Sequence, residues 1–265
     1  MTVKTRPAPQ GAWYLGLQPK DVAARCILVG DRARVDVFGR QLTEARVVSD
    51  RRGLRTLVGN YQGVPVTVSA FGMGGPIAAV LLEELAGIGV RVVLRAGTAM
   101  SLAPSRLRLG SFIIAHASLR AEGTSLTYAP LGYPAAADPI MVNTLVDVLK
   151  QSGLPYHLGI LATADGFYSE MLAPTPERAA PVEHRHDEFR RLGVLAADME
   201  TATLFVVASL LGVRAGSLCL VSVDGPGRAL LDDEARKQGE EQLVKLALEA
   251  LIRVPVDQTG ADVDR

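Results

Sequence analysis

The chain has 265 residues, of which 48% are hydrophobic and 5% aromatic. Lysine plus arginine and aspartate plus glutamate both number 28, so the formal net charge is zero. A neutral chain gives no long-range attraction toward nucleic acid or acidic lipid, and any anion site must come from a local cluster of charges. The length fits one large domain, and an aliphatic core suits a sheet covered by helices.

Apolar runs stay short of the ~20 residues that a membrane-spanning helix needs, and residues 2–10 lack the apolar core of a signal peptide. Cys26 and Cys219 each lie inside an apolar run, which favours buried, reduced thiols over redox or metal chemistry. We therefore predict a cytoplasmic protein that has no metal site and binds neither nucleic acid nor membranes.

Strand and helix signals alternate along the chain. Residues 1–11 lack periodicity and predict a loose arm. Short runs rich in β-formers predict strands over 26–29, 46–49, 54–58 and 64–70, with a hairpin turn at Gln62-Gly63. Apolar residues at helical spacing then predict a helix over 76–89, which Pro76 begins.

The second part of the chain continues this alternation. Further strands are predicted over 91–96, 111–115, 157–162 and 214–223, and helices over 139–151, 198–211 and 233–252. Residues 165–192 are interrupted by prolines and predict a long loop, or a loop with one short helix, of the kind that usually covers a site. The polar residues 256–265 predict a disordered tail. We expect residues 1–265 to form one α/β sandwich.

Two glycine turns follow predicted strands at the same edge of the sheet. Arg95 closes an apolar run and precedes Gly97 and Thr98, and the segment Phe71-Gly72-Met73-Gly74-Gly75-Pro76 opens a helix. The first turn offers a guanidinium and a hydroxyl, and the second offers bare backbone N–H groups. That combination suits a small doubly charged anion, most simply phosphate. The sequence contains neither a P-loop motif nor a complete dinucleotide fingerprint.

Arginines also follow strand ends in Gly30-Asp31-Arg32-Ala33-Arg34 and in Arg51-Arg52-Gly53. A single arginine at such a place is most often a solvated charge. Spacing alone does not establish that the three arginine segments meet at one anion.

Acidic residues mark two further places. Asp198-Met199-Glu200 lies between apolar flanks, where acids either complement a helix dipole or, if buried, accept hydrogen bonds from sugar hydroxyls. Asp224 follows an apolar strand and precedes Gly225-Pro226-Gly227. It suits a turn, and it also stands where α/β folds keep their ligands. The residues alone leave both interpretations open.

Five motifs stand in the order in which one known family has them: Gly30-Asp31-x-x-Arg34, Gly72-Met73-Gly74-Gly75-Pro76, Glu84-Leu85, Leu94-Arg95-x-Gly97-Thr98 and Asp198-Met199-Glu200-Thr201-Ala202. On these motifs, from about residue 14 to 251, the chain resembles the nucleoside phosphorylases of the hexameric bacterial type. Residues 117–138 are similar to the uridine phosphorylase branch in particular.

The resemblance implies a fold, a reaction and an assembly. The expected fold is a single-domain three-layer α/β/α sandwich with a mixed central sheet. The expected reaction is the reversible phosphorolysis of an N-glycosidic bond by a pentosyltransferase, which gives free base and (deoxy)ribose 1-phosphate. Inorganic phosphate is the co-substrate, and no cofactor is expected. The expected assembly is a dimer-based hexamer whose subunits share active sites.

The resemblance also implies roles for individual residues. Those expected to bind phosphate are Gly30, Arg34, Arg52, Arg95 and Thr98. Those expected to bind ribose are Tyr14, Met199 and Glu200. Those expected to contact the base are Phe167, Asp198 and Asp224, and those expected to act in catalysis are Arg95, Glu200 and Asp224. Arg52 and Tyr14 would reach the site of an adjacent subunit.

Departures from the family pattern bear on the base. Uridine phosphorylases read the pyrimidine through a glutamine and two arginines, whose places are taken here by Met171, Ala173 and Gly225. Asp224-Gly225 instead resembles the Asp-Gly of some purine phosphorylases, whose aspartate protonates the purine at N7. The residues therefore favour a purine nucleoside phosphorylase with Asp224 as general acid. The alternatives are a uridine phosphorylase with an altered base pocket, a nucleosidase, and a nucleoside-binding protein without turnover.

Overall fold

The computed structural model describes residues 12–256, so the expected arm at 1–11 and the expected tail beyond residue 256 lie outside the described residues. The strands are β1 (Arg25–Val29), β2 (Thr43–Arg51), β3 (Leu54–Tyr61), β4 (Val64–Ala70), β5 (Val92–Ser101), β6 (Phe112–Ala121), β7 (Tyr156–Ala164), β8 (Val194–Asp198), β9 (Arg214–Asp224) and β10 (Ala229–Leu230). The helices are α1 (Arg32–Gly39), α2 (Gly75–Gly87), α3 (Thr124–Tyr128), α4 (Pro139–Ser152), α5 (Pro176–Arg191), α6 (Thr201–Leu211) and α7 (Asp233–Arg253). Two short helical turns are η1 (Pro19–Asp21) and η2 (Phe167–Met171).

The described strands form one ten-stranded sheet in the order β10-β9-β6-β7-β8-β5-β1-β4-β3-β2. β1 is parallel to β4 and β5, and β5 is parallel to β9, whereas β6 is antiparallel to β9. β5 also pairs antiparallel with β8 through Met100 and Ala197. Because β5 pairs with both β8 and β9, five strands close into a ring, and β1 to β4 extend it as an open sheet. The expected mixed sheet is confirmed.

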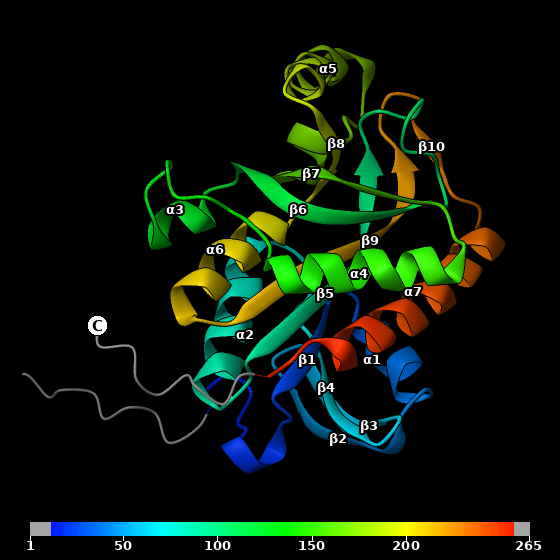
Figure 1. Ribbon diagram of the computed structural model, residues 1–265. Coiled ribbons are helices and arrows are strands. Elements are labelled where there is room, and N and C mark those ends of the chain that lie inside the picture. The colour runs from blue at the N-terminus through cyan, green and yellow to red at the C-terminus, as the bar shows by residue number, and fades with distance from the viewer. Residues whose placement is uncertain (1–11, 257–265) are drawn as a thin grey trace, which may run out of the picture.

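Helices cover both faces of this sheet, as Figure 1 shows. Alternation along β1 directs Cys26 and Leu28 toward the layer of α2 and α6, and Ile27 and Val29 toward the layer of α1, α4 and α7. Each fully buried aliphatic side chain of this kind contributes about 1.5–3 kcal/mol to folding. The two helix layers and the sheet confirm the three-layer α/β/α arrangement.

The segment 165–192 differs from the prediction, because it contains the 16-residue helix α5. Pro176 is the first helical residue, where the missing N–H would have no helical partner anyway. Pro181 lies in the second turn and removes one backbone hydrogen bond. Val182 and His186, four residues apart, bury one face of the helix and compensate for that loss. In Figure 1, α5 lies at the top of the view, apart from the two helix layers.

One strand was not predicted, and the boundaries of one helix and one further strand were predicted wrongly. Residues 194–198 form β8, and α6 begins only at Thr201 instead of at residue 198. All five residues of β8 are buried, and so short an apolar run looks the same in a helix and in a strand. β5 continues through Gly97 to Ser101, so Arg95 lies inside a strand and not at its end.

Glycines bring two strand ends together. The Gly72 N–H, just beyond β4, donates to the carbonyl of Gly30, just beyond β1, at 3.0 Å. A Cβ atom on Gly30 would lie 2.9 Å from the Gly72 carbonyl oxygen, so only glycine allows this approach. The two turns therefore lie at the same edge of the sheet, and the end of β1 lies beside the middle of β5.

Candidate functional site

A cavity of about 540 Å³ lies at the carboxyl ends of β1, β4, β8 and β9 and along the second half of β5. One part of its lining carries four arginines, namely Arg32, Arg34, Arg95 and Arg236. Another part is apolar, and its side chains belong to one hydrophobic cluster: Met100, Phe167, Met171, Ala197 and Val223. The cavity therefore joins a cationic region to an apolar one.

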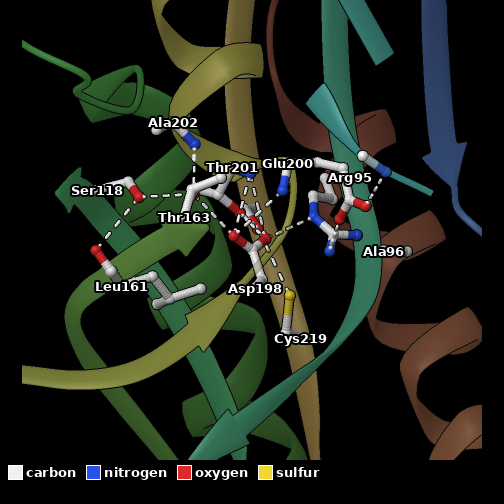
Figure 2. A network of polar contacts seen from close by, with 12 residues as sticks. Arg95, Ala96, Ser118, Leu161, Thr163, Asp198, Glu200, Thr201, Ala202 and Cys219 are labelled. Atoms are coloured by element: carbon white, nitrogen blue, oxygen red, sulfur yellow. Dashed lines mark hydrogen bonds and ion pairs between the residues drawn. The ribbon is translucent and has the colours of Figure 1, made fainter. Parts of the chain in front are cut away.

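Arg95 links the two regions through ion pairs with two carboxylates. Its Nε donates to Oδ2 of Asp198 at 2.9 Å, and its Nη2 donates to Oε2 of Glu200 at 2.6 Å (Figure 2). Arg95 is only 4% exposed. Burial alone would lower the pKa of Arg95, but the carboxylates of Glu200 and Asp198 outweigh that effect and raise it. The guanidinium therefore remains charged.

Asp198 is held from several sides. Its Oδ1 accepts from the hydroxyl of Thr163 at 2.8 Å, and its Oδ2 accepts from the hydroxyl of Thr201 (Figure 2). The backbone N–H of Thr201 donates to both oxygens at 3.2 Å. These contacts orient the carboxylate toward Arg95, and the contact with a base that the resemblance implied stays a prediction.

Glu200 connects Arg95 to the glycine turn. Its Oε1 accepts from the backbone N–H of Gly74 at 2.7 Å, while its Oε2 is paired with Arg95. Burial raises the pKa of Glu200, Arg95 lowers it, and the neighbouring Asp198 carboxylate raises it further, with the net shift upward. A buried carboxylate at this point suits the recognition of neutral hydroxyl groups.

The structure brings most of the expected phosphate-binding residues to the cavity: Gly30, Arg34, Arg95 and Thr98 all line it. Met199 and Glu200, expected at the ribose, and Phe167, expected at the base, line it as well. A Cβ atom on Gly97 would lie 2.0 Å from Nη1 of Arg95, so the absence of a side chain there allows the guanidinium to fold against β5.

Two expected residues lie together away from this lining. The guanidinium of Arg52 lies over the rings of Trp13 and Tyr14, at 5.5 and 5.2 Å from their centroids. Trp13 is 60% exposed. Neither Arg52 nor Tyr14 lines the cavity that the described residues of this copy form, although Gly53 does.

The side chain of Asp224, the last residue of β9, contacts the turn that follows the strand and not the cavity formed within residues 12–256. Its Oδ1 accepts from the backbone N–H of Gly227 at 3.0 Å, and its side chain is half-buried. The preceding residues Ser222 and Val223 line the cavity, whereas Asp224 is not among the described residues that do so. Its expected role as an acid therefore stays a prediction.

The turn η2, which carries Phe167 and Met171, is fixed by contacts with Glu170. The Glu170 carboxylate accepts from the backbone N–H of Gly166 at 2.8 Å and pairs with Arg185 of α5. Nε2 of His186 lies 3.1 Å from the Glu170 carbonyl oxygen. Burial lowers the pKa of His186, so its ring is neutral near neutral pH. Helix α5 therefore supports the apolar wall of the cavity.

Sequence reasoning missed Arg236, which reaches the cavity from α7. In the sequence alone, an arginine of a ligand site in an amphipathic helix looks the same as an arginine that only faces solvent. Within residues 12–256, no group of three or more His, Cys, Asp or Glu side chains is arranged to hold a metal ion. None of the described helices is both long enough and apolar enough to span a membrane.

Comparisons with known proteins agree on one family. The family model described as "Phosphorylase superfamily" matches residues 24–253. The chain is 36% identical to a uridine phosphorylase of Thermococcus kodakarensis over 241 residues, which cover 90% of this chain and 85% of that protein. It is 32% identical to a uridine phosphorylase of Escherichia coli over 247 residues, which cover 91% of this chain and 97% of that protein.

Solved structures give the same picture. A uridine phosphorylase from Vibrio fischeri superposes with a TM-score of 0.84 at 26% identity, over 94% of this chain and 100% of the other. A purine nucleoside phosphorylase from Toxoplasma gondii, solved in complex with immucillin-H, superposes with a TM-score of 0.82 at 26% identity, over 91% of this chain and 95% of the other.

Proposed function

Since the chain belongs to the phosphorylase superfamily and is a nucleoside phosphorylase, a pentosyltransferase, we propose that its arginine-lined cavity is the site where phosphate and nucleoside react. The observation that carries this proposal is the pairing of Arg95 with both Asp198 and Glu200. This pairing places the buried Arg95 guanidinium directly beside Glu200, the carboxylate that we assign to the sugar. Phosphate and ribose would then lie side by side.

We assign phosphate binding to Gly30, Arg34, Arg95 and Thr98, because these residues line the cationic part of the cavity. Guanidinium groups bind phosphate oxygens in a fixed fork geometry, and backbone N–H groups near Gly30 add neutral donors. Met199 and Glu200 are assigned to the ribose, with the Glu200 carboxylate accepting from the 2′ and 3′ hydroxyls. These positions aim the phosphate at the anomeric carbon.

The reaction follows from this arrangement. As the bond between C1′ and the base nitrogen breaks, its electron pair leaves with the base, and the sugar approaches an oxocarbenium ion. The bound phosphate stabilises that cation and then forms the new C1′–O bond. The departing base takes up a proton or a hydrogen bond, which lowers the barrier by ~2–4 kcal/mol. The products are free base and (deoxy)ribose 1-phosphate.

For the base, we propose uridine as the first substrate, because the relatives of 36% and 32% identity are uridine phosphorylases. The sequence alone instead favours purine nucleosides over uridine. Asp224, the acid of the purine hypothesis, accepts from Gly227 and does not line the cavity that the described residues form. Phe167 and Met171 would pack on the ring, and Ser222 of β9 offers a hydroxyl group in the cavity lining.

Purine nucleosides are the second candidate. The observation in their favour is that Met171 and Ala173 are buried and apolar, so their side chains offer no hydrogen bonds to the amide edge of a pyrimidine.

We also propose that Arg52 and Tyr14 act in the cavity of a neighbouring copy within a dimer-based hexamer. Their position in a partly exposed cluster with Trp13, outside the lining of their own cavity, supports this assignment. The cytoplasmic location stays a prediction.

One assay tests these proposals. The protein is incubated with uridine, thymidine, inosine or adenosine, each with and without phosphate, and base release is followed. Phosphate-dependent release from uridine is the expected result. Faster release from inosine or adenosine would replace uridine by a purine nucleoside. Base release without phosphate would indicate a nucleosidase. If no substrate releases base, the protein would be a nucleoside-binding protein without turnover. Arg95→Ala is the inactive control.

A further inference from the structure

The cavity contains a cation supplied by the C-terminal helix α7. Arg236 lines the cavity, and its Nε lies 3.2 Å from Oε1 of Glu240, one helical turn further along. Nη2 of Arg34 lies 3.0 Å from the same oxygen atom. Two guanidinium groups from α1 and α7 therefore converge on a single oxygen of one carboxylate.

These two arginines are less fully neutralised than the other cavity arginines. Arg95 pairs with two carboxylates, Asp198 and Glu200. Arg32 pairs with Asp50, which also pairs with Arg55, but Arg55 has Asp36 as a second partner, so these four charges balance. Arg34 and Arg236, by contrast, share Glu240. Within residues 12–256 the shared pair thus leaves a surplus of positive charge, which an anion in the cavity would neutralise.

Arg34 also retains unused hydrogen-bonding capacity. It is 5% exposed, and its Nη1 donates to the Ala96 carbonyl at 3.4 Å. Its Nε is buried and has no hydrogen-bond partner among the described residues. A buried donor without a partner is costly, so an oxygen acceptor brought to this place by a ligand would be favourable.

We propose that Arg236 is an additional phosphate-binding residue, and that Glu240 is the positioning residue that holds Arg236 and Arg34 toward the same anion. This inference rests on the proposed function, because it concerns the phosphate of that reaction. The Arg236 side chain is about half exposed, at 52%, and a long exposed side chain loses entropy when it binds a ligand. The contact with Glu240 four residues on restricts the side chain beforehand.

The test compares Arg236→Ala and Arg236→Lys with the control Lys237→Ala, which removes a neighbouring exposed charge on the same helix. We expect Arg236→Ala to raise the KM for phosphate about tenfold, the loss of one charge-assisted hydrogen bond, with kcat and the KM for nucleoside within about twofold. Arg236→Lys should restore part of the loss. Equal phosphate KM values for Arg236→Ala and Lys237→Ala would overturn the proposal.

A double-mutant cycle tests the role of Glu240. Glu240→Gln should raise the KM for phosphate, and should have a smaller effect when Arg236 is already alanine. Glu240→Asp should restore part of the affinity. Independent, additive effects of the two substitutions would overturn the positioning role.

A binding measurement separates this inference from the proposed function. Inorganic phosphate alone should raise the Tm of the wild-type protein and raise it less in Arg236→Ala. If phosphate stabilises the wild type in this way while no nucleoside is cleaved, the anion site stands and the proposed function fails. If uridine is cleaved but both proteins respond equally to phosphate, the proposed function stands and the role of Arg236 fails.

Discussion

Arg95 and Asp198 are separated by 103 residues in the chain, yet their ion pair of 2.9 Å forms the centre of the buried polar network. Both side chains are almost completely inside the protein. An ion pair of this kind orients its members firmly, and removal of one partner leaves an uncompensated buried charge.

Asp198→Asn should therefore impair both stability and turnover. Breaking a buried pair typically costs ~3–5 kcal/mol, and the remaining partner Glu200 should keep the loss near the lower value. Urea unfolding measures the first effect, and the kcat/KM for phosphate, expected to fall at least about tenfold, measures the second. Asp187→Asn, at an exposed pair with Arg190, is the control and should change little. Equal behaviour of the two variants would contradict the prediction.

Gly97→Ala should disable Arg95 without altering its charge. The new methyl group would lie 2.0 Å from Nη1 and 2.6 Å from Cζ of Arg95, and the buried guanidinium has little room to move away. We expect a rise of about tenfold or more in the phosphate KM, measured by steady-state kinetics. Gly132→Ala is the matched control, because a Cβ atom there meets no described atom within 4 Å. A normal phosphate KM in Gly97→Ala would show that Arg95 does not need its observed position.

The affinity for nucleoside should fall as the pH falls. Burial raises the pKa of Glu200, partly offset by Arg95 and reinforced by Asp198, so its carboxylate becomes protonated at a higher pH than an exposed glutamate. Protonation removes one acceptor for the ribose hydroxyls. The nucleoside KM, measured at saturating phosphate from about pH 8 down to pH 5, should therefore rise in the wild type. Glu200→Gln should show a high KM at every pH, and a parallel pH profile in both proteins would refute the assignment.

Asp224→Asn separates the two base hypotheses. Because the Asp224 carboxylate accepts from Gly227 and lies outside the cavity lining, we expect uridine turnover to stay within about twofold of the wild type. If the aspartate protonates a purine, inosine turnover should instead fall by ~10²-fold while the phosphate KM stays unchanged. Base release from uridine and inosine by the same variant measures both effects.

The sequence predicted the parts of the fold and site that depend on local pattern. Gly30 directly follows a strand, and Arg95 and Thr98 lie in one, and the apolar runs of both strands are visible in the chain. All three line the cavity together with Arg34, which lies in α1. The segment 194–198 was missed because its uniform apolar run carries no periodicity.

Long-range contacts could not be predicted from the sequence. The sharing of Glu240 between Arg34 and Arg236 joins residues about 200 positions apart, and no local pattern encodes such a contact. The side-chain direction of Asp224 depends on the turn geometry that brings the Gly227 N–H to it. In both cases the residue type showed which contacts a side chain could make, and only the folded structure shows which partner it contacts.

The double pairing of β5 has a consequence for how ligands exchange with solvent. Its residues pair with β9 from Val92 to Ser101, and with β1 and β8 over parts of that length. Widening the cavity on this side would break backbone hydrogen bonds to three strands at once. By contrast, η2 is held to α5 by contacts of Glu170 with Arg185 and His186. We therefore expect product to leave past η2 and α5, and the backbone amides of β5 to exchange their hydrogens more slowly than those of η2.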